Sequence, residues 1–160
     1  MNKELTIPYF YYSSLNELSE VERKLFHLAL DARKNAYAPY SEFLVGCALL
    51  LEDGEMVSGS NQENAAYPSG LCAERTAIFW ASANHPGKKI LKLFALGAPI
   101  KAPSKSALVP PCGACRQSIL EYESRQDQGI EIYFATLEGE VCKTRSIRDL
   151  LPFSFDKSFL

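Results

Sequence analysis

The order of helical and strand-like stretches along this chain leaves few folds open to it. Apolar residues at helical spacing predict a first helix within residues 16–36, capped by Asn16 or Ser19 and broken at Pro39. Two strands, a helix, a strand, a helix and two strands follow, at residues 43–51, 55–64, 72–84, 90–98, 112–126, 130–139 and 140–147. Helices that alternate with strands predict an α/β fold, a three-layer α/β/α sandwich with a mixed sheet of about five strands.

The length and charge of the chain exclude several classes of protein. A chain of 160 residues is expected to form a single domain with a sizeable core. The formal net charge is −2 and no long run of lysines and arginines occurs, so we expect no nucleic-acid partner and no membrane partner. The apolar runs are far shorter than the roughly 20 residues of a membrane span, and none resembles a signal peptide. We therefore expect a cytoplasmic protein.

The chain has five cysteines, and they fall into two groups. Cys47 lies in the apolar run "FLVGCALLL" and Cys142 in the alternating "EVCKT", so both are expected to pack as small apolar strand residues. Cys72, Cys112 and Cys115 lie instead where helices are predicted to begin. An odd number of cysteines argues against a set of paired disulfides and favours free thiols.

The spacing of these last three cysteines indicates a metal site. Cys112 and Cys115 are three residues apart in the first turn of a helix that follows Pro111, so their side chains share one face. A helix N-terminus lowers the pKa of a thiol, and zinc binds the thiolate. With Cys72 at the start of another helix, three thiolates would hold zinc and leave its fourth position to water. That pattern is typical of a catalytic zinc site rather than a structural one.

Two charged residues near Cys72 fit a catalytic role. Zinc with three thiolates carries a net negative charge, and Arg75 is placed to offset it by donating hydrogen bonds to the sulfurs. Glu74 can point at the open position and relay a proton from the water to a substrate. Simpler interpretations are a solvated Arg75 and a Glu74 that only complements the helix dipole. For Arg116 we expect the solvated state.

Other interpretations of the cysteines explain less. A redox C-x-x-C pair would leave Cys72 without a role, and a structural zinc ribbon would need Cys47 or Cys142 as a fourth ligand. The two histidines do not help. His27 lies among the apolar positions of the first helix and His85 just before a proline, so neither is expected to bind metal.

Five blocks of sequence together resemble the small homotetrameric type of cytidine deaminase, a zinc enzyme in its three-cysteine form. In chain order they are "YAPYSEFLVG" (37–46), "NQENAAYPSG" (61–70), "CAERTAI" (72–78), "PCGACRQ" (111–117) and "LLPFSF" (150–155). The resemblance implies a single catalytic domain over residues 16–160. Residues 1–15 then form an N-terminal extension to which no role is assigned.

The resemblance implies a hydrolase of pyrimidine salvage that converts cytidine and 2′-deoxycytidine to uridine and 2′-deoxyuridine plus ammonia. Cys72, Cys112 and Cys115 would hold one zinc per subunit, and zinc hydroxide would attack C4 of the cytosine. Glu74 would shuttle protons to N3 and to the departing amine.

The resemblance also implies a set of substrate contacts. Asn61 and Glu63 are two residues apart at the end of a predicted strand, so they share a face, and they would hydrogen-bond the ribose 3′-hydroxyl. Further contacts to the base or the sugar are implied for Phe43, Tyr67, Ala73 and Phe155. Phe155 would come from a neighbouring subunit of a homotetramer with shared active sites, and Phe153 is the alternative to it.

Three other functions stay open from the sequence. A related deaminase could act on a modified cytosine nucleoside of the blasticidin type, although the Asn61 and Glu63 pair favours an ordinary ribose. A polynucleotide editor would need a basic groove, which the net charge disfavours. A non-catalytic zinc-stabilised binding protein would not need Glu74.

Overall fold

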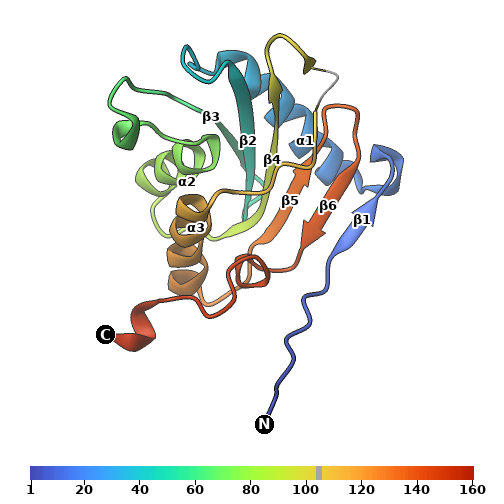
Figure 1. The fold of residues 1–160 in the computed structure, drawn as a ribbon. Helices are drawn as coiled ribbons and strands as arrows, with labels where there is room; N and C mark the ends of the chain where they lie inside the picture. The colour runs from blue at the N-terminus through green and yellow to red at the C-terminus, as the bar shows by residue number, and fades with distance from the viewer. Residues whose placement is uncertain (104–105) are drawn as a thin grey trace.

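The computed structural model describes residues 1–103 and 106–160, which form three layers (Figure 1). A mixed sheet contains β1 (Phe10–Tyr12), β2 (Phe43–Leu51), β3 (Met56–Ser60), β4 (Ile90–Pro99), β5 (Glu131–Ala135) and β6 (Val141–Thr144). Its order is β1-β6-β5-β4-β2-β3, and only β4 and β5 pair in parallel. Helix α1 (Glu20–Ala32) covers one face, and α2 (Ala73–Asn84) and α3 (Gly113–Gln126) cover the other. The predicted three-layer α/β/α sandwich is confirmed.

Alternation along the central strands divides the core into two parts. In β2, Cys47, Leu49 and Leu51 join the buried cluster that contains residues of α2 and α3. Ala48 and Leu50 point the other way and join the cluster under α1. Because successive side chains of a strand face opposite sides of the sheet, an almost wholly apolar strand suits a sheet covered on both faces.

The first helix is shorter than its apolar pattern predicts. Of the two proposed caps, Ser19 is the one used. Its hydroxyl accepts a hydrogen bond from the Glu22 backbone, and the Glu22 carboxylate accepts one from the Ser19 backbone. This capping box starts α1 at Glu20, and residues 15–17 and 33–35 form separate 3-10 turns.

The sheet has six strands rather than five, because residues of the N-terminal extension add one. β1 pairs antiparallel with β6, and the Tyr11 hydroxyl donates a 2.8 Å hydrogen bond to Glu140. The Phe10 ring lies 5.0 Å from the Nζ of Lys143, a cation–π contact. Three residues are too few to give a periodic signal, and their pairing partner lies at the far end of the chain.

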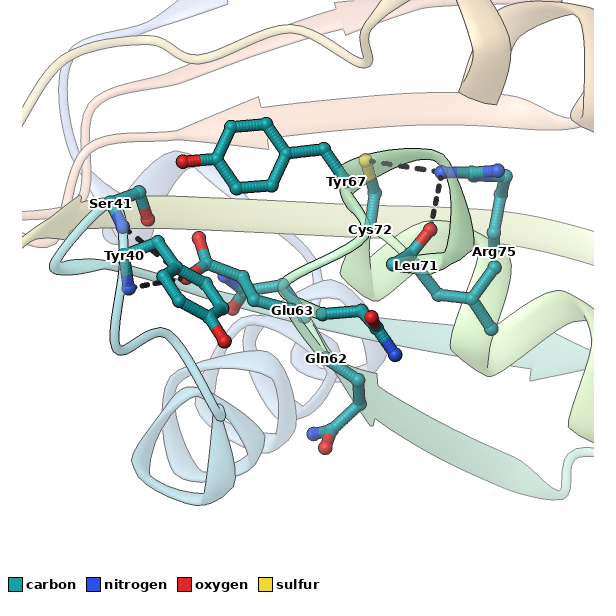
Figure 2. Close-up of a pocket in the computed structure, with 11 residues that line it drawn as sticks. Tyr40, Ser41, Gln62, Glu63, Tyr67, Leu71, Cys72 and Arg75 are labelled. Carbon is teal, nitrogen blue, oxygen red and sulfur yellow. Dashed lines mark hydrogen bonds between the residues drawn. The ribbon is translucent and has the colours of Figure 1, made fainter.

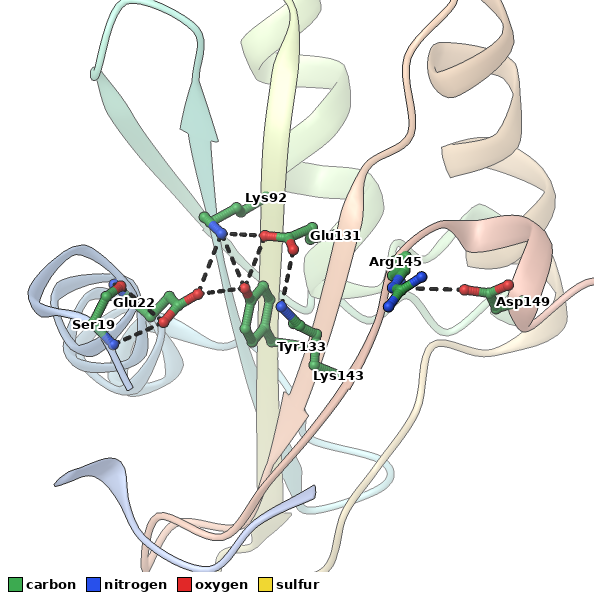
Figure 3. Close-up of polar contacts among 8 residues, drawn as sticks. All are labelled: Ser19, Glu22, Lys92, Glu131, Tyr133, Lys143, Arg145 and Asp149. Carbon is green, nitrogen blue, oxygen red and sulfur yellow. Dashed lines mark hydrogen bonds and ion pairs between the residues drawn. The ribbon is translucent and has the colours of Figure 1, made fainter. Parts of the chain in front are cut away.

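A charged network joins α1 to the sheet (Figure 3). The Tyr133 hydroxyl donates to Glu22 at 2.6 Å, and Lys92 contacts Glu22 at 3.3 Å. Glu131 pairs with Lys92 and with Lys143, the latter at 3.0 Å. Each polar group of this buried or partly buried network therefore has a hydrogen-bonding or oppositely charged partner.

Helix α2 lies unusually close to β3, and Gly59 is the reason. A Cβ at Gly59 would lie 2.6 Å from the backbone nitrogen of Ala77 and 2.9 Å from the carbonyl oxygen of Ala73. Only glycine permits this backbone-to-backbone approach. The contact sets the position of the first turns of α2, which follow Cys72.

Candidate functional site

The thiols of Cys72, Cys112 and Cys115 converge on one point. Cys72 and Cys112 are the residues that immediately precede α2 and α3, and neither side chain caps its own helix. Cys115 lies in the first turn of α3 and is fully buried. All three sulfurs lie within 4.8 Å of one another. The predicted convergence of two helix N-termini is confirmed.

The distances between the sulfurs suit a zinc ion. Sγ of Cys112 lies 3.7 Å from Sγ of Cys72 and 3.5 Å from Sγ of Cys115. Two sulfurs bound to one tetrahedral zinc at about 2.3 Å are about 3.8 Å apart. A disulfide would need about 2.05 Å, so these are free thiols, and both spacings are close to those of two sulfurs on one zinc.

The electrostatics favour a thiolate at this site. A hydrogen bond with the Cys115 thiol and the nearby Arg75 guanidinium lower the pKa of Cys72 to about 5. The same hydrogen bond raises the pKa of Cys115, so the proton shared by the two thiols stays on Cys115 until a bound metal displaces it. Arg75 Nη2 lies 3.9 Å from Sγ of Cys72 and donates to the Gly70 carbonyl at 3.3 Å (Figure 2). Arg75 is therefore engaged with the sulfur rather than free in solvent.

Glu74 is a buried carboxyl beside the thiols. It lies in the first turn of α2 and is only 6% exposed. Burial raises the pKa of Glu74 to about 7, and the negative charge of Cys72 acts in the same direction. A carboxyl with such a pKa can both accept and release a proton near neutral pH.

A cavity of about 400 Å³ opens next to Cys72 (Figure 2). Of the residues singled out in the sequence, Asn61, Glu63, Tyr67 and Arg75 also line it. Asn61 is buried, whereas Tyr67 is 74% exposed. A cavity of this size beside one of the three clustered thiols can hold a small molecule.

The strand that leads to Asn61 ends earlier than predicted. β3 stops at Ser60, not at residue 64, because the backbone of Gln62 pairs with Leu71 and forms a bridge to Tyr37. The prediction that Asn61 and Glu63 lie on one face of the same strand is therefore wrong. Both side chains nevertheless reach the cavity.

The other predicted contact residues do not line this cavity within the described chain. Phe43 is half-buried at the start of β2, and Ala73 is buried at the start of α2. Phe155 is 58% exposed and stacks on Phe159, with ring centroids 5.5 Å apart. Phe153 is 98% exposed. The roles given to these residues stay predictions.

The sequence analysis assigned no role to one residue near the site and a wrong state to another. Tyr40 lines the cavity, and its ring centroid lies 5.9 Å from that of Tyr67. Its place in the block "YAPYSEFLVG" was the only feature of the sequence that could have pointed to it. Arg116 was expected to be solvated, and this is wrong. Its guanidinium donates to the Pro111 carbonyl at 2.8 Å and to the Leu150 carbonyl at 2.7 Å. It ties the residue before Cys112 to the C-terminal segment.

The remaining cysteines and histidines lie apart from the metal site. Cys47 and Cys142 are buried in the core, which confirms their packing role and leaves the zinc-ribbon interpretation without a fourth ligand among the described residues. His27 is exposed on α1, and His85 Nδ1 lies 3.2 Å from Glu55. In the described parts of the chain no helix is both long enough and apolar enough to cross a membrane.

Comparison with known proteins agrees with this geometry. Residues 19–127 match the family model "Cytidine and deoxycytidylate deaminase zinc-binding region". Cytidine deaminase of Sporosarcina psychrophila is 42% identical over 86% of this chain and 93% of its own length, and that of Halalkalibacterium halodurans is 41% identical over 79% and 88%. The crystal structure of cytidine deaminase from Burkholderia pseudomallei, 37% identical, superposes with a TM-score of 0.72 over 86% of this chain and all of its own.

Proposed function

This chain belongs to the cytidine and deoxycytidylate deaminase family, and from that premise we propose that it deaminates cytidine and 2′-deoxycytidine hydrolytically in pyrimidine salvage. The products are uridine or 2′-deoxyuridine and ammonia. It is a zinc-dependent hydrolase that acts on a carbon–nitrogen bond. The observation that carries this proposal is the cluster of three sulfurs near the buried carboxyl of Glu74, one of whose cysteines, Cys72, also lines the cavity.

Three thiols supply the metal site. Cys72, Cys112 and Cys115 would hold zinc, which when bound would supply the Lewis acid that makes water nucleophilic near neutral pH. The N–H groups at the starts of α2 and α3 and the Arg75 guanidinium draw negative charge from the sulfurs. Zinc with three thiolate ligands would therefore remain a strong enough Lewis acid to activate water.

Glu74 moves the protons. Its buried carboxyl accepts one from the attacking water and donates one to N3 of the cytosine ring. It then takes the remaining proton from the hydroxyl now on C4 and hands it to the departing amine, so that ammonia leaves and the C4 carbonyl of uridine forms. The pKa of about 7 allows both directions of transfer at neutral pH.

The cavity binds the nucleoside. Asn61 and Glu63 hydrogen-bond the ribose 3′-hydroxyl, and Tyr67 lies near the sugar. Phe43 packs against the pyrimidine, and the backbone of Ala73 faces its polar edge. A carboxylate at the sugar end favours a neutral hydroxyl over a phosphate group.

The active protein is a homotetramer in the cytoplasm. Phe155 of one subunit covers the base in a neighbour, which agrees with its exposure in the single chain. Phe79 and Trp80 on the outer face of α2 are exposed aromatic side chains of the kind that subunit contacts bury. Free thiols are maintained in a reducing compartment.

The decisive experiment is a comparison of wild type with Glu74→Gln. Zinc-loaded wild type should deaminate cytidine, followed by loss of ultraviolet absorbance. The variant should bind equal zinc and lose at least about a hundredfold in kcat, the typical contribution of a proton-transfer group. No turnover by the wild type would overturn the proposed reaction, and equal rates would remove Glu74 from it and favour a non-catalytic role.

A further inference from the structure

One wall of the cavity is bonded along its length to a second chain segment. The Tyr37 backbone N–H donates to the Asn61 carbonyl at 2.9 Å, and the Glu63 N–H donates to the Tyr37 carbonyl at 2.8 Å. These two bonds fix where the loop of residues 37–43 leaves the wall. The loop carries Tyr40 to the cavity and ends at Phe43.

The side chain of Glu63 continues this contact. Its Oε2 accepts hydrogen bonds from the backbone N–H of Tyr40 at 2.9 Å and of Ser41 at 3.2 Å (Figure 2). The bonds to Ser41 and Tyr40 lower the pKa of the Glu63 carboxyl, so it is ionised at neutral pH. They involve only one of its two oxygens, which leaves Oε1 for a substrate hydroxyl.

The side chain of Asn61 holds the other end of the loop. Its Oδ1 accepts from the Val45 N–H at 2.8 Å, and its Nδ2 donates to the Phe43 carbonyl at 2.9 Å. Asn61 is 9% exposed, so both bonds are sheltered from water. A side-chain amide can donate from its nitrogen and accept at its oxygen at the same time.

The loop needs such anchors because its backbone is strained. Glu42 has a φ of +50°, in the left-handed region that non-glycine residues rarely adopt because Cβ comes too close to the following carbonyl oxygen. Its N–H donates to the Ala38 carbonyl at 3.1 Å, and its carbonyl accepts from Ile100 at 2.8 Å. A strained turn persists only where surrounding bonds determine its shape.

We propose that Asn61 and Glu63 are positioning residues that hold the 37–43 loop, and with it Tyr40 and Phe43, in the shape that receives the cytosine ring. This inference rests on the proposed function for its substrate, and it goes beyond a contact with the sugar. The Glu63 carboxylate would then bind the sugar hydroxyl with one oxygen and the loop that packs on the base with the other. Recognition of the sugar and placement of the base become one event.

Hydrogen exchange on the substrate-free protein tests the anchoring directly. Glu63→Ala should speed exchange of the Tyr40 and Ser41 amides by about tenfold or more, as expected for loss of hydrogen bonds to a charged group. The Glu42 amide, which bonds Ala38 rather than the altered side chain, should accelerate as well because the turn itself relaxes. Unchanged protection at Glu42 would overturn the proposal.

Ligand binding tests the consequence for the base. In zinc-loaded protein carrying Glu74→Gln, Glu63→Ala should weaken binding of 2′,3′-dideoxycytidine, which lacks the 3′-hydroxyl, by about tenfold, and Glu63→Gln should restore most of it. Residues that only touched the hydroxyl would leave this affinity unchanged, and that result would also overturn the proposal. Lys34→Ala, an exposed substitution in the 3-10 turn that follows α1, is the matched control. It should change neither the exchange rates nor the affinity for the ligand.

The two proposals fail in different ways. If the wild type does not deaminate cytidine, the proposed function fails while the exchange result on the free protein still decides the anchoring. If cytidine is deaminated but Glu42 keeps its protection in Glu63→Ala, only the positioning role fails.

Discussion

The Sγ atoms of Cys72 and Cys112 lie 3.7 Å apart, although 40 residues separate the two cysteines in the chain. Each precedes a different helix, and the two helices are held together by the apolar cluster that they share with the sheet. The metal site is therefore a product of tertiary packing as much as of its ligands. Substitutions of the thiols and substitutions that alter the packing of the two helices should both weaken metal binding.

Removing one thiol should remove the metal. Cys112→Ser is expected to lose most of its zinc and to unfold at lower urea concentration, because bound metal adds about 4 kcal/mol when free zinc exceeds its Kd a thousandfold. Metal content and urea midpoints would be measured with and without a chelator. Cys142→Ala is the control and should keep its zinc, since Cys142 packs in the core away from the cluster. One zinc per chain in Cys112→Ser would contradict the assignment.

Gly59→Ala should push α2 away from β3. A Cβ placed 2.6 Å from the Ala77 nitrogen cannot be accommodated without a backbone shift, so we expect a loss of about 1–3 kcal/mol in the free energy of unfolding. Ser58→Ala, an exposed neighbour on the same strand, should change it by less than about 0.5 kcal/mol. Equal stability of the two variants would show that α2 is free to move.

Arg116→Gln should loosen the C-terminal segment. The variant loses hydrogen bonds from a charged group to the carbonyls of Pro111 and Leu150, so the free energy of unfolding should fall by about 2 kcal/mol. Arg125 lies on the same helix, with its guanidinium over the Tyr122 ring, and Arg125→Gln should lower the free energy of unfolding by less. Denaturant titrations of both variants would compare them, and similar losses would argue against a tie at Arg116.

Acid should destabilise the protein through Glu22. Burial acts to raise the pKa of this carboxyl, but hydrogen bonds from Tyr133 and Ser19 outweigh it and lower the pKa to about 2. The pKa of a glutamate in the unfolded chain is about 4.3. The stabilisation by the ionised Glu22 is therefore complete above that pH and is lost as the pH falls toward about 2.

Substitution isolates this contribution. Glu22→Gln retains the capping box, because glutamine can also accept from Ser19, but it should flatten the decline of stability between about pH 4.3 and pH 2. Urea unfolding across this range is the measurement. Glu20→Gln removes only an exposed pair with Lys24 and should leave the slope nearly as in wild type. An unaltered slope in Glu22→Gln would contradict the prediction.

Local pattern was enough to predict much of this molecule. The apolar runs of β2 and β4 and the helix starts at Cys72 and Cys112 are signals carried by neighbouring residues. The three-layer arrangement and the convergence of the thiols follow from them.

What the sequence did not predict depends on distant partners. β1 exists because Phe10 and its neighbours meet the edge of β6, and β3 stops at Ser60 because Gln62 pairs with Leu71. The bonds from Arg116 likewise depend on where Leu150 lies in the fold. No periodicity within one segment reports such contacts.

The pairing of β1 with β6 also decides where the chain can be shortened. β1 covers the outer edge of β6 with three residues and then turns into the first helical region. A truncated form beginning at residue 16 would expose the amides and carbonyls of Val141–Thr144 to other molecules in solution. Such an open edge recruits strands from other copies, so the shortened enzyme should aggregate at concentrations at which the full chain stays dispersed.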